Sequence, residues 1–305
     1  MTADLPPSID TTAAQRWADR ALDGSPWLHE EVGRRMQERL QWIKLEPAAW
    51  VDWEPLRGGL TAHAAIAQRY ARARCHVVEG VAKNSERAAG LLRKPWWGRL
   101  PWAGAQTVHG PPSDAGVQMV WANMALHMAA DPQALIALWH RWLAVDGFLM
   151  FSCLGPDTLR ELRDACKAQG WPPPAHEFTD MHDWGDMLVH NGFAEPVMDM
   201  ERITLTFDSP QRALQELRGL GRNLHIHRFA GLRGRQWLQC LGRMMESNGV
   251  PEDASAHGVA MTFEIIYGHA LKAAPRLAVK SETVLSLDEM RRVLARRGAV
   301  PGAHG

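Results

Sequence analysis

Between residues 48 and 154, short apolar runs alternate with longer runs in which apolar residues recur at helical spacing. Strands of a parallel sheet are buried on both faces, so they are continuously apolar, and crossover helices join them. The pattern therefore predicts an α/β fold with a doubly wound, mainly parallel sheet. The expected strands of this region are residues 48–53, 75–80, 105–109, 116–122 and 148–154.

The rest of the chain continues this alternation less strictly. Two further strands are expected, over residues 196–206 and 259–270. Helices are expected where charged residues separate apolar ones at helical spacing. The expected helices are residues 11–22, 27–43, 59–73, 82–94, 131–147, 156–169, 182–191, 209–219, 232–248 and 286–298.

These elements divide the chain into three parts. Residues 1–46 form an N-terminal helical segment, and residues 47–274 form the α/β domain, with lid or substrate segments at about 155–250. Residues 275–305 hold one amphipathic helix and a Pro/Gly-rich end that we expect to be mobile.

The composition argues against several classes of protein. Lys plus Arg and Asp plus Glu balance at 34 each, so we expect no nucleic-acid partner. The four cysteines form no close pair, and His225 and His227 read as polar loop residues, so no metal site is expected. No apolar stretch is long enough to span a bilayer, and the N-terminus lacks the pattern of a signal peptide. We expect a cytoplasmic protein without a membrane partner.

Polar residues stand at the ends of the predicted strands, where ligands bind in open α/β sheets. Asp52 ends the first strand, Glu79 the second, and Asn123 follows the fourth. An acid at the position of Glu79 can accept hydrogen bonds from both hydroxyls of a ribose, which a nucleoside-containing cofactor presents. The alternative is that Glu79 is only a solvated acid at the end of a strand and binds no ligand.

The segment WVDWEPLRGG, residues 50–59, resembles the start of a nucleotide-binding loop and then departs from it. Gly58 and Gly59 are present, but Glu54 and Leu56 stand where such loops place their first glycines. Glycine is used there because the backbone adopts unusual dihedral angles and the cofactor approaches closely.

A basic stretch lies in the predicted lid. Residues 212–243 carry seven arginines and one acid, Glu216. The stretch is either a solvated face or a docking surface for an acidic partner, in which complementary charge speeds the encounter. The arginines are Arg212, Arg218, Arg222, Arg228, Arg233, Arg235 and Arg243.

The chain resembles the class I S-adenosylmethionine-dependent methyltransferases and, within them, the malonyl-acyl-carrier-protein O-methyltransferases of biotin synthesis. The resemblance runs from about residue 27 to about residue 272. Its most specific segments are ANMALHM (122–128), FSCLGPDTLRELR (151–163), FTDMHDWGDMLVHNGFAEPVMDMERITLTF (178–207) and YGHA (267–270).

The resemblance implies a Rossmann-like, seven-stranded sheet with an antiparallel last strand, and S-adenosylmethionine as the cofactor. By position, Asp52 is the acid that ends the first strand and Gly58 is the last glycine of the loop. Glu79 would bind the ribose hydroxyls, and Ala122 and Asn123 would line the methionine end of the cofactor.

The resemblance also implies a substrate side formed by residues 155–245 and an acyl carrier protein as partner. The reaction is transfer of a methyl group from a sulfonium to the free carboxylate of a malonyl thioester. Because a carboxylate is already nucleophilic, alignment and desolvation do most of the work, and no catalytic acid or base is expected. The expected substrate- and partner-binding residues are Arg218, Arg222, Arg228, Tyr267 and His269.

Three departures from the family pattern concern the cofactor site. The loop carries Glu54 and Leu56 in place of glycines, and Glu54 adds a negative charge that a proton or Arg57 could offset. Leu22–Asp23 stands where the family has a tyrosine before an aspartate. The third strand lacks its terminal acid, for which Asp114 is a substitute.

Two hypotheses follow. In the first, the protein is an active methyltransferase with a remodelled loop. In the second, it is a catalytically impaired methyltransferase-fold protein, a pseudoenzyme that serves as a binding module for an acidic protein partner. A third hypothesis, an NAD(P)-type dinucleotide-binding protein, is disfavoured, because it needs the same glycines and the later segments resemble methyltransferases.

Overall fold

The computed structural model describes residues 9–20, 24–92, 106–247 and 258–274. Residues 1–273 form one compact unit and residues 274–305 a second, so the expected C-terminal helix lies outside the described residues. Within the described ranges, no helix combines the length and the apolar character needed to cross a bilayer.

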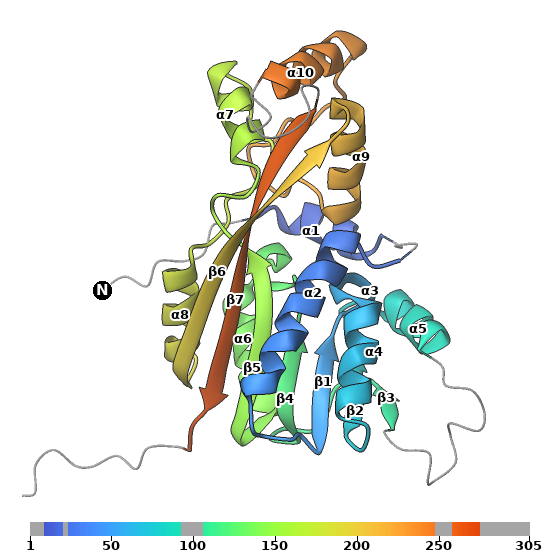
Figure 1. The fold of residues 1–305 in the computed structure, drawn as a ribbon, viewed down its shortest axis with the longest axis vertical. Coiled ribbons are helices and arrows are strands. Elements are labelled where there is room, and N and C mark those ends of the chain that lie inside the picture. Colours follow the sequence, from blue (N-terminus) through green and yellow to red (C-terminus); the bar gives the residue numbers. More distant parts are fainter. Residues whose placement is uncertain (1–8, 21–23, 93–105, 248–257, 275–305) are drawn as a thin grey trace, which may run out of the picture. The chain divides into compact units, whose positions relative to one another are not determined.

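Seven strands form one sheet in the order β3-β2-β1-β4-β5-β7-β6 (Figure 1). β7 is antiparallel to both of its neighbours, and the pairs formed by the first five strands are parallel. The predicted mainly parallel sheet with an antiparallel last strand is therefore confirmed. The strands are β1 (Ala49–Trp53), β2 (Arg74–Val78), β3 (Thr107–His109), β4 (Val117–Ala122), β5 (Leu143–Leu154), β6 (Phe193–Phe207) and β7 (Val259–Lys272).

Helices pack on both faces of the sheet, because successive strand residues point to opposite faces. Trp50 and Trp121 lie in one apolar core with α2 and α4, whereas Val51 and Val120 lie in another with α6 and α8. These helices are α2 (Trp27–Arg39), α4 (Leu60–Arg69), α6 (Pro132–Trp142) and α8 (Met181–His190).

The remaining helices are short or lie within residues 155–250, the segment predicted to form a lid and called the lid below. α7, α9 and α10 gather at one end of the long strands β6 and β7 (Figure 1). These helices are α1 (Thr11–Ala18), α3 (Pro55–Gly58), α5 (Ala82–Leu91), α7 (Arg160–Ala168), α9 (Pro210–Leu220) and α10 (Arg235–Ser247), with the 3₁₀ turns η1 (Leu40–Trp42) and η3 (Leu126–Met128).

Several predicted boundaries differ by a few residues, and the one after Asp131 was wrong about the type of element. The helix expected over residues 131–147 does begin at the N-cap Asp131, whose carboxylate accepts a hydrogen bond from the Ala134 N–H, but it ends at Trp142. From Leu143 the chain is already in β5, where Leu143 pairs with Val117 of β4. Pairing with β4, together with a register shift between Val117 and Met119, outweighs the helical pattern of this stretch.

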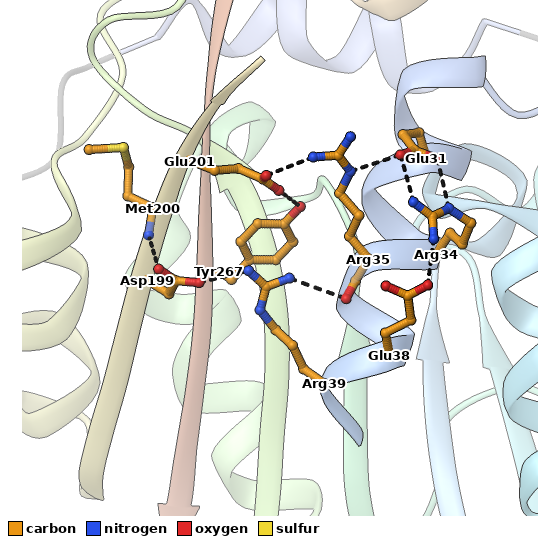
Figure 2. Close-up of polar contacts among 9 residues, drawn as sticks. All are labelled: Glu31, Arg34, Arg35, Glu38, Arg39, Asp199, Met200, Glu201 and Tyr267. Carbon is orange, nitrogen blue, oxygen red and sulfur yellow. Dashed lines mark hydrogen bonds and ion pairs between the residues drawn. The ribbon is translucent and has the colours of Figure 1, made fainter. Parts of the chain in front are cut away.

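A network of charged side chains attaches α2 to β6 and β7 (Figure 2). Arg35 binds Glu201 at 2.7 Å and Arg39 binds Asp199 at 2.7 Å. The Tyr267 hydroxyl donates to Glu201 at 2.5 Å, and the Arg39 guanidinium lies 3.7 Å from the centre of the Tyr267 ring. Burial, followed by this carboxylate, raises the pKa of Tyr267. The network holds the N-terminal helices against the sheet.

The chain has two tyrosines, Tyr70 and Tyr267, and Tyr70 can serve as the control for a substitution of Tyr267. Tyr70 is also buried, but its hydroxyl has no partner among the described residues. Tyr267→Phe removes a hydrogen bond to a carboxylate, so we expect the free energy of unfolding to fall by about 1 kcal/mol or more. Tyr70→Phe should be neutral or stabilising, and chemical denaturation measures both. Equal effects would contradict a stabilising role of the Glu201 bond.

Candidate cofactor and substrate site

The first strand ends in a buried hydrogen-bonded pair of polar side chains. Asp52 is 2% exposed, and its Oδ2 lies 2.7 Å from Nδ1 of His63 on α4. Burial raises the pKa of Asp52, and His63 partly offsets that rise. The carboxylate therefore joins the strand to the helix that follows it.

The segment after β1 has positive φ angles at two positions, Glu54 and Gly59. Glu54 adopts a left-handed conformation with φ 52° and ψ 53°, which costs a non-glycine residue about 1 kcal/mol. Gly59 has φ 130°, and a Cβ on Gly58 would lie 3.1 Å from the Asn123 carbonyl oxygen. Glycine is thus required at 58 and 59, and Pro55 starts the short helix α3 between them and Glu54.

The Glu54 side chain extends toward the end of β2. Its Oε1 lies 2.6 Å from the position that a Cβ on Gly80 would occupy. Burial raises the pKa of this carboxyl group, and the charge of Arg57 and the Gly80 N–H partly offset that rise. The carboxyl group therefore lies between the ends of β1 and β2, where the cofactor was predicted.

Glu79 has one free carboxyl oxygen. Its Oε1 accepts a hydrogen bond from the Leu56 N–H at 3.1 Å, whereas its Oε2 is buried without a partner among the described residues. Burial, with the charges of Glu54 and Asp52, raises the pKa of Glu79 to about 8. Most molecules therefore carry a protonated Glu79 at neutral pH.

Asn123 joins three elements at the end of β4. Its Nδ2 donates to the His29 carbonyl at 2.7 Å and to the Gly58 carbonyl, and its Oδ1 accepts from the Ser152 hydroxyl at 2.6 Å. Asn123 is 2% exposed and Ala122 is fully buried in the core on the α6 side. Both are buried beside the loop, and neither residue lines the two cavities described below.

Two cavities meet at this end of the sheet. The proximal cavity, about 210 Å³, is lined by residues that include Trp17, His29, Glu54, Arg57 and Met124. The distal cavity, about 230 Å³, is lined mainly by apolar side chains of the lid, such as Leu214, Leu217 and Phe263, together with Arg218 and Arg222. Met128 and Leu220 line both cavities, so the two are neighbours.

The histidines around the cavities are neutral at physiological pH. Burial lowers the pKa of His29 to about 4 and holds that of His127 well below its usual range. His176, whose pKa burial also lowers, lies with its Nε2 2.8 Å from the His127 carbonyl oxygen. Sequence reasoning singled out none of the three, because their burial becomes visible only in the folded chain.

The predicted substrate-side residues are not all brought together. Arg218 is exposed beside the distal cavity, and Arg222 donates to the carbonyl groups of Arg218 and Gly221. Arg228 pairs with Asp10 at 2.7 Å. Tyr267 belongs to the network of Figure 2, and His269 lies 5.4 Å from the Phe148 ring, so neither β7 residue lines the two cavities.

Two further expectations concern Asp114 and Leu22–Asp23, at which the chain departs from the family pattern. The prediction that Asp114 replaces the acid after β3 was wrong. Asp114 lies just before β4, at the amino ends of the parallel strands, and it pairs with Arg141 at 3.1 Å. The pair Leu22–Asp23 lies outside the described residues.

Solved structures show that this fold is that of the class I methyltransferases. A methyltransferase candidate from Bacillus halodurans C-125 covers 79% of this chain with all of its own length, at a TM-score of 0.50 and 14% identity. The YcgJ protein of Bacillus subtilis covers 79% with 99% of its length, at a TM-score of 0.50 and 11% identity. No family model matches the chain.

Sequence relatives define the family more closely. The malonyl-acyl-carrier-protein O-methyltransferase of Gallionella capsiferriformans is 38% identical over 88% of this chain and 93% of its own length. The proteins of that name from Methylovorus and Laribacter hongkongensis are 36% and 35% identical, over 92% and 85% of this chain and 94% and 88% of their own lengths. The chain belongs to the malonyl-acyl-carrier-protein O-methyltransferase family.

The raised pKa of Glu79 makes stability depend on pH. A glutamate ionises near 4.5 in the unfolded chain and Glu79 near 8 in the folded protein, so between these values the folded state holds more protons. We therefore expect stability to fall as pH rises through this window. Glu79→Gln should reduce the loss by at least ~2 kcal/mol, measured by denaturation at about pH 5 and about pH 8. The exposed Glu177→Gln is the control, and an unchanged loss in Glu79→Gln would argue against a buried, protonated Glu79.

Proposed function

We propose that this protein is an S-adenosylmethionine-dependent O-methyltransferase that esterifies the free carboxylate of a malonyl thioester carried by acyl carrier protein, in biotin synthesis. The observation that carries the proposal is the pair of adjoining cavities at the carboxyl ends of β1 and β4. One is bounded by the loop after β1 and the other by the lid, so a methyl donor and an acceptor would meet near Met128. Relatives that span most of the chain bear the name of this activity.

The residues at the carboxyl ends of the strands fit the cofactor at one point and obstruct it at another. The buried Oε2 of Glu79 has no hydrogen-bond partner among the described residues, and ribose hydroxyls would provide one. Glu79 would therefore hold S-adenosylmethionine, which supplies a methyl group on a sulfonium. The obstruction is Glu54, whose side chain must turn away from Gly80 to admit a nucleoside.

The protein's part in the reaction is to orient the acceptor and exclude water. A carboxylate needs no base to become a nucleophile, which agrees with the neutral state of His29 and His127. Alignment in a dry cavity is the main contribution that remains. The apolar lining of the distal cavity suits the uncharged arm of a thioester, and Arg218 stands exposed beside it.

One observation favours a second function. The Glu54 carboxyl group lies over Gly80, in the space assigned to the nucleoside. If this side chain does not move, the protein is a binding module for an acidic carrier protein and transfers no methyl group.

Titration calorimetry with S-adenosylhomocysteine separates the two functions. For an active enzyme we expect micromolar binding, and Glu54→Gly should tighten it by no more than ~10-fold, since one side chain is cleared from the path. Asp146→Gly is the matched control, because Asp146 also has a positive φ, 65°, but lies on β5 away from the cavities. Heat absent at millimolar ligand in the folded wild type, but present in Glu54→Gly, would establish the second function.

Carrier-protein binding tests the basic surface of the lid. Arg222 and Arg228 have partners within the chain, whereas Arg218 is exposed and has no ion pair among the described residues. Arg218→Glu should weaken binding of malonyl-acyl carrier protein at low salt by ~3- to 10-fold, and added salt should reduce the difference. Arg72→Glu, an exposed change at the other edge of the sheet, should have no effect. Equal affinities in all three proteins at low salt would exclude this surface.

A further inference from the structure

The Arg57 guanidinium is fixed on one side and unpartnered on the other. Its Nη2 donates to the carbonyl groups of Trp17, Ala18 and Arg20 at 2.6, 3.1 and 3.2 Å, at the end of α1. Its central carbon lies 4.6 Å from the centre of the Trp17 ring. Nη1 is buried and has no hydrogen-bond partner in the described part of the chain.

Arg57 dominates the positive charge of the proximal cavity. It is the sole arginine or lysine among the described residues that line this cavity, and His29 is neutral there because its pKa is about 4. Of the two acids of the lining, Asp131 caps α6, whereas the Glu54 carboxyl group lies at Gly80 and interacts with the charge of Arg57. The described residues contain no ion pair between Glu54 and Arg57.

A buried guanidinium nitrogen without an acceptor carries a desolvation cost, which a bound anion would remove. Carboxylates match guanidinium groups in geometry and charge, and such charge-assisted bonds are stronger than neutral ones. Because three carbonyl groups and an aromatic ring already hold Arg57, binding an anion would require little further ordering of its side chain.

We propose that Arg57 is the carboxylate-binding residue of the proximal cavity. This inference rests on the proposed function, because that function supplies two ligands with a free carboxylate. One is the methionyl end of the cofactor and the other is the malonyl group of the acceptor. Glycines bind a ligand through their backbone alone, so Arg57 gives this chain a charged anchor in a loop where Glu54 and Leu56 stand in place of glycines.

Ligands that differ by a carboxylate identify the source on the unaltered protein. S-adenosylhomocysteine is compared with 5′-methylthioadenosine, which lacks the amino-carboxyl end, and malonyl-pantetheine with acetyl-pantetheine. A carboxylate held by Arg57 should make one member of a pair bind ~10- to 100-fold more tightly. The ligand pair whose two members differ in affinity identifies which carboxylate Arg57 binds.

Variants then assign the difference to Arg57. Arg57→Gln should abolish the preference for the carboxylate-bearing ligand and leave the affinity for its partner unchanged, and Arg57→Lys should retain part of it. Arg69→Gln is the matched control, since Arg69 donates to the Leu40 carbonyl at 2.9 Å and faces the Tyr70 ring, outside the cavity.

The outcomes separate the inference from the proposed function. Tight binding of S-adenosylhomocysteine with no preference in either ligand pair, or a preference that survives in Arg57→Gln, would overturn the inference alone. If the wild type binds neither carboxylate-bearing ligand, both the inference and the proposed function are overturned. Thermal unfolding of Arg57→Gln and Arg69→Gln shows whether either variant is folded.

Discussion

The side-chain amide of Asn123 is the contact on which the geometry of the site depends. Its two N–H groups bind carbonyl oxygens of α2 and of the loop after β1, and its oxygen accepts a hydrogen bond from β5. Buried polar groups that satisfy one another in this way are costly to separate, because each would be left without a partner. The edge of the sheet, the N-terminal helix and the loop are therefore held in one arrangement by a single residue.

Around this anchor, the segment after β1 combines an unusual backbone conformation with charged side chains. Glu54 takes the left-handed conformation that suits a glycine, and Gly58 and Gly59 remain where close approach and a positive φ require them. Glu54 and Arg57 place an acid and a base at the edge of the proximal cavity. If the proposed cofactor binds here, the charges of Glu54 and Arg57 and the space taken by Glu54 would affect its binding.

Sequence patterns predicted the parts of the fold that local periodicity determines. The strand ending in Asp52, the strand near Glu79 and the helix starting after Asp131 were expected from apolar runs and capping residues. The start of β5 at Leu143 was not, because pairing with β4 overrides a helical pattern. The free nitrogen of Arg57 and the neutral state of His29 depend on burial by segments distant in sequence, so no local pattern indicates them. The prediction for Asp114 failed because the connection from β3 to β4 places this residue at the amino ends of the parallel strands, away from the carboxyl ends where the site lies.

The antiparallel strand has a consequence for how the chain is made. β7 lies between β5 and β6, and it is the only strand of the described sheet that pairs with β6. During synthesis, β6 and the lid helices emerge before β7 exists, so β6 has no partner strand until residues 259–272 have been translated. Completion of the fold thus waits for residues 259–272, and until then β6 exposes an unpaired edge that invites aggregation.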